Sequence, residues 1–232
     1  MNTENNAANT KTTVFNLIIL DESGSMGSLT NATISGCNET LSVIRAAQQQ
    51  VGDRQRHLVS IYAFQSGAVP SRYIIKNAPI ANVRDLTNRD YRPEGCTPLY
   101  DAVGMTLADL EAVASTHEDA AAVVTIITDG YENSSTAYSG PQVAKMIAAL
   151  KERGWTFNFI GANIDVEKVS RTLNIDNAMA WTSSEAGTRE MYSKFRDNYS
   201  DCMHDFDCED STMPVEDRIE MRKKRSKNFF KK

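Results

Sequence analysis

The sequence has few of the features that mark secreted, disulfide-stabilised or membrane-spanning proteins. Its 232 residues include only four cysteines, which are too few and too scattered for a disulfide framework, so we expect reduced thiols. No apolar run approaches the roughly 20 residues that cross a bilayer. The first 13 residues are polar and rich in Asn and Thr, without the apolar segment of a signal peptide. These absences predict a cytoplasmic protein that does not enter the membrane.

Composition and length indicate one globular core. With 41% hydrophobic residues, 24% charged residues and a formal net charge of −5, the bulk of the chain is not built to bind nucleic acid. A chain of this length can bury one sizeable core without a second domain. We expect a disordered N-terminal tail at 1–12, one domain at 13–200, and a C-terminal tail at 201–232 that is first acidic and then basic.

The order of apolar segments predicts a doubly wound, Rossmann-like α/β fold. Residues 14–20 and 120–128 are nearly continuous apolar runs, typical of strands buried on both faces in a parallel sheet. Strands expected at 57–64 and 73–76 are joined by a connection too short for a parallel return, so they should pair antiparallel at the sheet edge. Further strands are expected at 155–160 and 178–182, and helices at 28–50, from Leu99 onward, 141–153, 166–173 and 185–199. Strands that alternate with helices favour this architecture.

Five oxygen-bearing residues follow the ends of these buried strands or begin a helix. They are Asp21, Ser23 and Ser25 after the first strand, Thr97 at a helix start, where we expect it to be the N-cap, and Asp129 after the fourth. In parallel sheets, ligands collect beyond the carboxyl ends of the strands. Hard cations such as Mg²⁺ take oxygen ligands, whereas zinc would require His or Cys, and neither clusters here. The pattern predicts a Mg²⁺ site.

The charge of this donor set suggests what the ion could do. If the hydroxyls of Ser23, Ser25 and Thr97 are direct ligands and Asp21 and Asp129 act partly through water, the inner shell is mostly neutral. The divalent charge is then incompletely compensated, so the ion can accept one more carboxylate. An Asp or Glu side chain of a partner protein could supply it.

These motifs resemble the metal-ion-dependent adhesion site of von Willebrand factor type A (VWA) domains. The matching segments are Asp-Glu-Ser-Gly-Ser at 21–25, Gly-Cys-Thr-Pro-Leu-Tyr-Asp at 95–101 and Thr-Asp-Gly at 128–130, and the similarity in motif order and strand spacing covers about 13–182. The resemblance implies a six-stranded, mostly parallel sheet, bound Mg²⁺ or alternatively Mn²⁺ or Ca²⁺, and non-catalytic recognition of a partner's acid. Without a signal peptide, the chain is similar to the intracellular bacterial or phage members.

Other interpretations of the motif residues are weaker. Asp21 and Asp129 could cap the helices that follow, but capping does not require the three hydroxyl residues. Ser25 does not fit a hydrolase nucleophile elbow, because the second glycine comes too early. A metal-dependent phosphoester hydrolase is the rival function, since Mg²⁺ beside carboxylates also serves phosphoryl transfer. No second acidic cluster or candidate nucleophile supports it.

Charged residues outside the motif have simple interpretations. We expect four acids near it to be solvated rim charges: Glu22, Glu94, Asp101 and Glu132. Cys202, His204 and Cys208 match no standard zinc spacing. The basic segment 218–232 is most simply a solvated, mobile end, and its alternative is a docking segment for nucleic acid, an acidic partner or the chain's own acidic stretch at 201–210.

Overall fold

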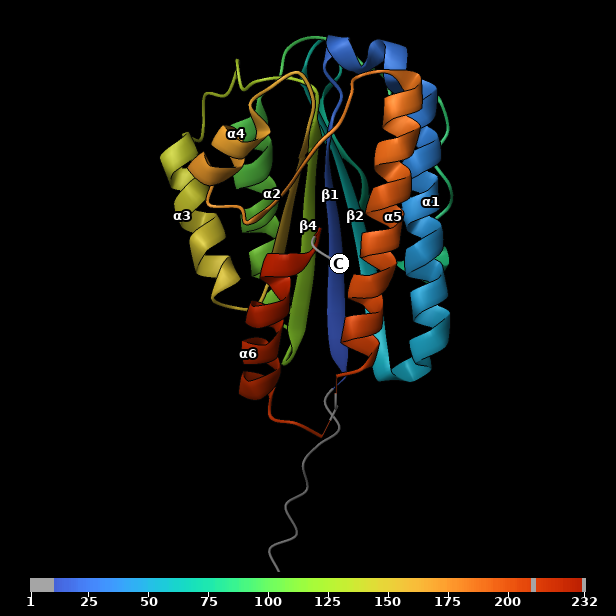
Figure 1. Cartoon of the computed structure of the whole chain (residues 1–232), viewed down its shortest axis with the longest axis vertical. Coiled ribbons are helices and arrows are strands. Elements are labelled where there is room, and N and C mark those ends of the chain that lie inside the picture. Colours follow the sequence, from blue (N-terminus) through green and yellow to red (C-terminus); the bar gives the residue numbers. More distant parts are fainter. Residues whose placement is uncertain (1–10, 210–211, 231–232) are drawn as a thin grey trace, which may run out of the picture.

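Residues 11–209 and 212–230, which the computed structural model describes, form a six-stranded sheet with helices on both faces (Figure 1). The strands are β1 (Thr12–Asp21), β2 (Gln55–Ser66), β3 (Pro70–Pro79), β4 (Ala120–Thr128), β5 (Thr156–Gly161) and β6 (Asn177–Ala180). Their spatial order is β3-β2-β1-β4-β5-β6, and only the β2–β3 pair is antiparallel. The predicted fold class, with one antiparallel edge strand, is confirmed, but that strand has ten residues and is longer than the short strand expected at 73–76.

The central strand β1 is buried along its whole length. It pairs in parallel with β2 on one side and with β4 on the other. Both neighbours are also nearly continuously buried, which explains why their sequences are apolar runs rather than alternating patterns. Because all three strands run in the same direction, the residues that follow them meet at one end of the sheet.

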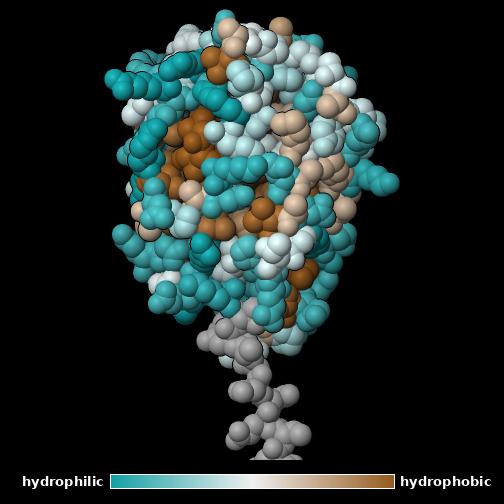
Figure 2. All heavy atoms as spheres, turned by 180° about the vertical axis from the view of Figure 1, so that it is seen from behind, coloured by the Kyte–Doolittle hydropathy of each residue, from teal (hydrophilic) through white to brown (hydrophobic). Residues whose placement is uncertain are grey.

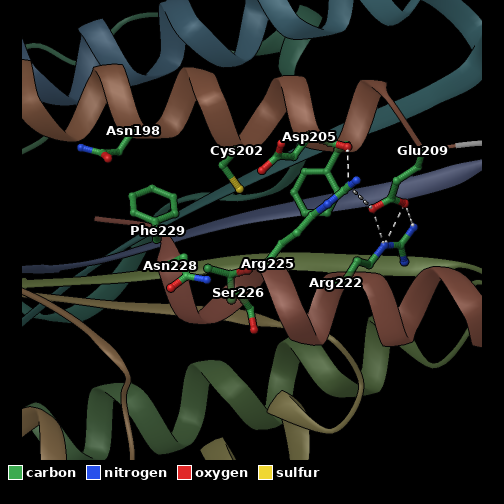
Figure 3. Close-up of a pocket in the computed structure, with 11 residues that line it drawn as sticks. Asn198, Cys202, Asp205, Glu209, Arg222, Arg225, Ser226, Asn228 and Phe229 are labelled. Atoms are coloured by element: carbon green, nitrogen blue, oxygen red, sulfur yellow. Dashed lines mark hydrogen bonds and ion pairs between the residues drawn. The ribbon is translucent and has the colours of Figure 1, made fainter. Parts of the chain in front are cut away.

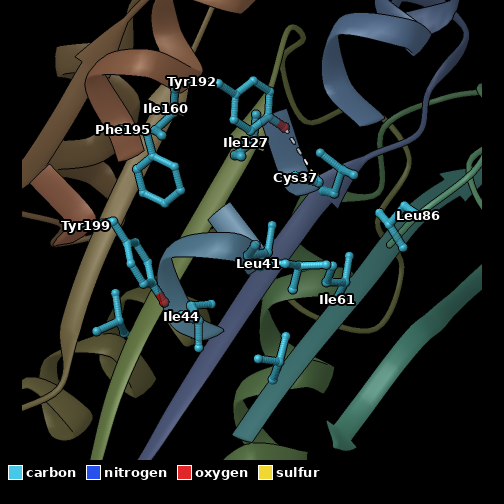
Figure 4. Close-up of a cluster of buried hydrophobic side chains, with 14 of the residues drawn as sticks. Cys37, Leu41, Ile44, Ile61, Leu86, Ile127, Ile160, Tyr192, Phe195 and Tyr199 are labelled. Atoms are coloured by element: carbon cyan, nitrogen blue, oxygen red, sulfur yellow. Dashed lines mark hydrogen bonds between the residues drawn. The ribbon is translucent and has the colours of Figure 1, made fainter. Parts of the chain in front are cut away.

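Helices cover each face of the sheet. They are α1 (Thr30–Val51), α2 (Leu99–Ala114), α3 (Gly140–Lys151), α4 (Val166–Thr172), α5 (Glu185–Asp207) and α6 (Val215–Arg225). Side chains of α1 and α5 form one core cluster with the sheet, and those of α2, α3 and α4 form the other. Figure 4 shows Tyr192, Phe195 and Tyr199 of α5 packed beside Leu41 and Ile44 of α1.

The outer surface agrees with the charged composition. The face opposite to that of Figure 1 is mostly hydrophilic, with smaller hydrophobic areas (Figure 2). Among the described residues, Met105 and Tyr131 are the large hydrophobic side chains that stand exposed. None of the helices in the described ranges combines the length and the apolar character that a bilayer span requires.

The C-terminal part of the chain is folded onto the domain. α5 continues to Asp207, so the boundary expected at residue 200 falls inside a helix. The basic segment then forms α6, and Arg218 and Arg222 are buried. The interpretation of this segment as a solvated, mobile end is therefore wrong for residues 215–225. Of the expected N-terminal tail, residues 1–10 lie outside the described residues, and Thr12 already begins β1.

Complementary charges explain why α6 packs against the body of the protein. Arg222 forms ion pairs with Asp119 at 2.7 Å and with Glu209 at 2.6 Å, and Arg218 forms one with Asp119 at 2.8 Å. Figure 3 shows the bonds from Arg222 to Glu209 between α5 and α6. Glu209 belongs to the acidic stretch at 201–210, so the alternative in which the basic segment docks on that stretch holds for Arg222.

Candidate functional site

The five predicted residues come from three loops at one end of the sheet, the upper end in Figure 1. Asp21 is the last residue of β1, and Asp129 follows the last residue of β4. Ser23 and Ser25 lie at the start of the 3-10 helix Gly24–Leu29, which leads into α1. Thr97 lies two residues before α2, and the N-cap of that helix is Pro98, so the expectation that Thr97 is the N-cap was wrong.

Hydrogen bonds connect four of the five residues. Ser25 Oγ donates to Asp129 Oδ1 at 2.6 Å, and the hydroxyl oxygens of Ser23 and Ser25 lie 3.2 Å apart. The backbone N–H of Ser23 donates to Asp21 Oδ1 at 2.7 Å. The structure therefore brings residues 21–25 and Asp129, which are more than 100 residues apart in sequence, into direct contact.

Thr97 lies beside this group. Its Oγ1 is 3.4 Å from the position that a Cβ on Gly130 would occupy, next to Asp129. The Thr97 backbone is held by Asn133, whose Oδ1 accepts the Thr97 N–H at 2.8 Å. No hydrogen bond links the Thr97 hydroxyl to any part of the chain that the structure describes, although the residue is only 3% exposed. This hydroxyl is thus available to a ligand.

Among the described residues, the site holds two carboxylates without a positively charged side chain beside them. Asp21 is fully buried, and burial raises its pKa to about 6, with a further contribution from the charge of Asp129. Thr128 Oγ1 donates to Asp21 Oδ2 at 2.5 Å, and this hydrogen bond partly offsets the rise in the Asp21 pKa that burial causes. Within the described ranges neither carboxylate is ion-paired to a Lys, Arg or His side chain. A bound cation would provide the missing positive charge.

The chemistry of the donor set fits a hard divalent cation. Two carboxylates and three hydroxyls offer only oxygen atoms, which Mg²⁺, Mn²⁺ and Ca²⁺ accept. The described residues contain no group of three or more His, Cys, Asp or Glu side chains that could hold a metal, so this set depends on its hydroxyls. At the C-terminal end of α5, Cys208 Sγ lies 3.6 Å from His204 Nε2, and no third His, Cys, Asp or Glu of the described residues joins this pair in a metal-binding group.

Sequence analysis missed a sixth polar residue at the site. Ser183, in the loop between β6 and α5, places its Oγ 3.5 Å from Asp129 Oδ2. The second carboxylate oxygen of Asp129 therefore also has a neighbour. Ser183 belongs to no motif, and only its position after a parallel strand that ends at the same edge of the sheet could have indicated it.

The expectation that Glu22 is a solvated rim charge was wrong. The Glu22 side chain is 0% exposed and forms a bidentate ion pair with Arg72 of β3, at 2.5 and 3.0 Å. It also accepts hydrogen bonds from Gln65 Nε2 at 2.9 Å and from the backbone N–H of Arg92. Its counter-charge lies 50 residues away in sequence, which is why the motif alone did not predict burial.

Two other acids brace the loop that follows Asp129. Asp101 accepts three backbone N–H bonds from residues 136–138, and Glu132 accepts the N–H of Tyr100, at 2.9 Å. They order the 131–139 loop rather than acting only as solvated charges. Glu94 is exposed, as expected, and accepts the N–H of Ala68 at 3.2 Å.

Comparison with known proteins supports the fold at low sequence identity. The sequence matches no family model, and a search of curated proteins also found no match. Solved structures that are similar include the pilus adhesin SpaC from Lactobacillus rhamnosus GG, with a TM-score of 0.59, 13% identity and coverage of 83% of this chain and 31% of that one. The PilB minor pilin from Streptococcus sanguinis has a TM-score of 0.57 at 11% identity, covering 83% and 62%.

A third similar structure is proximal thread matrix protein 1 from the mussel byssus, with a TM-score of 0.50, 14% identity and coverage of 84% of this chain and 47% of that one. This chain spans less than two thirds of the length of each of these three proteins. At such identities the likeness shows the architecture alone. With the strand order of its sheet, it shows that the chain has a six-stranded, mostly parallel α/β fold of the kind found in these proteins.

Proposed function

We propose that the chain is a non-catalytic protein-binding module that holds Mg²⁺ at a metal-ion-dependent adhesion site and recognises an acidic side chain of a partner protein. In this proposal Ser23, Ser25 and Thr97 bind the ion through their hydroxyls, and Asp21 and Asp129 hold it directly or through water. Mn²⁺ or Ca²⁺ could replace Mg²⁺, since both accept the same oxygen ligands. The role is that of a scaffold or assembly component in the cytoplasm.

One observation supports the proposal: Asp21, Ser23, Ser25 and Asp129 are linked by hydrogen bonds, and within the described residues no Lys, Arg or His pairs with either carboxylate. Ser25 and Asp129 are in contact at 2.6 Å, and Asp21 is buried with a raised pKa. A divalent ion relieves the repulsion between the carboxylates. Because three of the five donors are neutral, the ion keeps residual positive charge, which favours a carboxylate as an additional ligand.

Metal titration tests the first half of the proposal. Isothermal titration calorimetry with Mg²⁺ and Mn²⁺ should detect one site in the wild type. Ser25→Ala and Asp129→Ala should weaken or abolish binding, because each removes a proposed donor. Ser28→Ala is the matched control, since Ser28 lies exposed on the same 3-10 helix outside the site. Absence of binding in the wild type at millimolar metal would refute the proposal.

Affinity purification tests the second half. Partners captured in Mg²⁺ and released by EDTA should disappear with Ser23→Ala/Ser25→Ala, and replacing the partner's contacting Asp or Glu by Asn or Gln should abolish capture. A parallel assay with a generic phosphoester such as p-nitrophenyl phosphate addresses the rival chemistry. Turnover that depends on metal and is lost in Asp21→Ala would replace the binding role by a hydrolase.

A further inference from the structure

The buried ion pair between Glu22 and Arg72 lies directly behind the candidate site. Glu22 separates Asp21 from Ser23 in sequence, and its side chain is fully buried. Arg72 contributes both terminal nitrogens to it, while 29% of the Arg72 side chain remains exposed. A buried carboxylate is costly unless it is paired and hydrogen-bonded, so this arrangement needs a reason beyond packing.

The same ion pair joins two of the three loops that supply the site. Besides Glu22, Arg72 Nη2 donates to the carbonyl of Asp90 at 2.8 Å, and Glu22 accepts the N–H of Arg92. Gln65 Nε2 donates both to Glu22 and to the carbonyl of Arg92. Residues 90–92 lead within a few positions to Thr97. The charge pair therefore fixes the segment that carries Thr97 against the segment that carries Ser23 and Ser25.

Backbone bonds continue this connection to the site itself. Glu94 N–H donates to the carbonyl of Glu22 at 2.8 Å, and Gly24 N–H donates to the carbonyl of Gly95 at 3.1 Å. Gly95 has a φ of +69°, and a Cβ there would approach the backbone of Gly67 to 2.4 Å, so the loop passes very close to β2 and β3. Residues 90–95 have further anchors: Tyr91 Oη donates to the carbonyl of Asp21 at 2.6 Å, and Asp90 forms an ion pair with Arg84 at 2.6 Å.

We propose that Arg72, acting through Glu22, is a positioning residue that sets the distance between the Thr97 hydroxyl and the Ser23 and Ser25 hydroxyls, and thereby the metal affinity of the site. This inference rests on the proposed metal site. Arg72 touches no proposed ligand side chain. It acts by holding two loops in one relative position. Metal sites generally depend on such supporting groups, which lie behind the ligands and fix their orientation.

The sign of the effect separates positioning from simple electrostatics. Removing a positive charge near a cation site should by itself strengthen cation binding. Loss of positioning should weaken it, and removal of supporting groups behind metal ligands typically costs 10- to 100-fold in affinity. We therefore expect Arg72→Met to raise the Kd for Mn²⁺ by about tenfold or more, against the direction that charge alone predicts.

The experiment measures Mn²⁺ affinity by calorimetry on the full chain, alongside urea unfolding. Arg89→Met is the matched control, because Arg89 is exposed just before the 90–95 segment that Arg72 holds, carries the same charge and has no hydrogen bond to Glu22. Arg72→Lys, which keeps the charge but not the two-pronged geometry, should also weaken Mn²⁺ binding, and it replaces Arg72→Met if that variant does not fold.

The outcomes are distinguishable. If the wild type binds no Mn²⁺, the proposed metal site fails. If the wild type binds and the folded Arg72 variants bind as tightly or more tightly, the metal site stands and the positioning role is refuted. Weaker binding in both Arg72 variants, with Arg89→Met unchanged, supports the inference.

Discussion

Replacing Arg222 by methionine should destabilise the fold strongly, because it leaves two buried carboxylates without their main partner. The Arg222 side chain is 1% exposed, and it bonds both oxygens of Asp119 and both oxygens of Glu209. Breaking a buried ion pair by removing one partner costs roughly 3–5 kcal/mol. Arg218 still neutralises Asp119 at 2.8 Å, and Arg225 lies 3.8 Å from Glu209. We therefore expect a loss near the lower end, about 3 kcal/mol.

Urea unfolding followed by tryptophan fluorescence can measure this loss. Trp155 is completely buried and adjacent to Gly154, where an added Cβ would lie 2.9 Å from Arg222 Cβ, so its emission reports on this region. Lys223→Met is the control, because Lys223 forms only partly exposed ion pairs with Glu152 and Glu220, so its loss should cost far less stability than the loss of Arg222. If Arg222→Met costs no more than Lys223→Met, the structural role assigned to this ion network is refuted.

Two further substitutions test the core between the sheet and helices α1 and α5. Burial lowers the pKa of His57 to about 4 from 6.5, so the neutral ring stabilises the fold above pH 6.5, and this contribution, about 3 kcal/mol, is lost as the pH falls towards 4. His57→Phe should flatten that part of the stability–pH curve in urea titrations, and an unchanged curve would contradict this assignment. Gly36→Ala should cost at least about 1 kcal/mol despite the higher helix propensity of alanine, since its Cβ would lie 2.0 Å from the Tyr192 ring. Gly27→Ala, with nothing within 4 Å, is the control in thermal unfolding, and an equal effect of both changes would contradict this packing.

The sheet could be predicted because its signals are local. Strands buried on both faces, such as β1 and β4, must be apolar at nearly every position; β1 ends at Asp21, and Asp129 directly follows β4. The topology of parallel strands then places Asp21 and Asp129 at one edge without any knowledge of side-chain positions. The same rule covers Ser23 and Ser25, whereas Thr97, which precedes a helix, was included because of its place at a helix start and the motif resemblance.

The features that were missed depend on partners distant in sequence. α6 has no apolar stripe. Its buried face carries Arg218 and Arg222, which pair with Asp119, just before β4, and Glu209, just after α5. A helix anchored by charge does not show the periodicity from which helices are recognised. Glu22 was misjudged for the same reason, since its burial is possible only because β3 brings Arg72 to it.

The ion network around Arg222 and the ion pair between Arg72 and Glu22 lie at opposite ends of the sheet. Thr12, which accepts a hydrogen bond from Arg218, begins β1, and Asp21 ends it. A strand of ten residues extends about 30 Å, which is several Debye lengths at physiological salt. Substitutions at Arg222 should therefore change the free energy of unfolding without changing Mn²⁺ affinity in the folded protein, whereas substitutions at Arg72 should change both. In the double variant the two losses of stability should add, because residues this far apart share no partner.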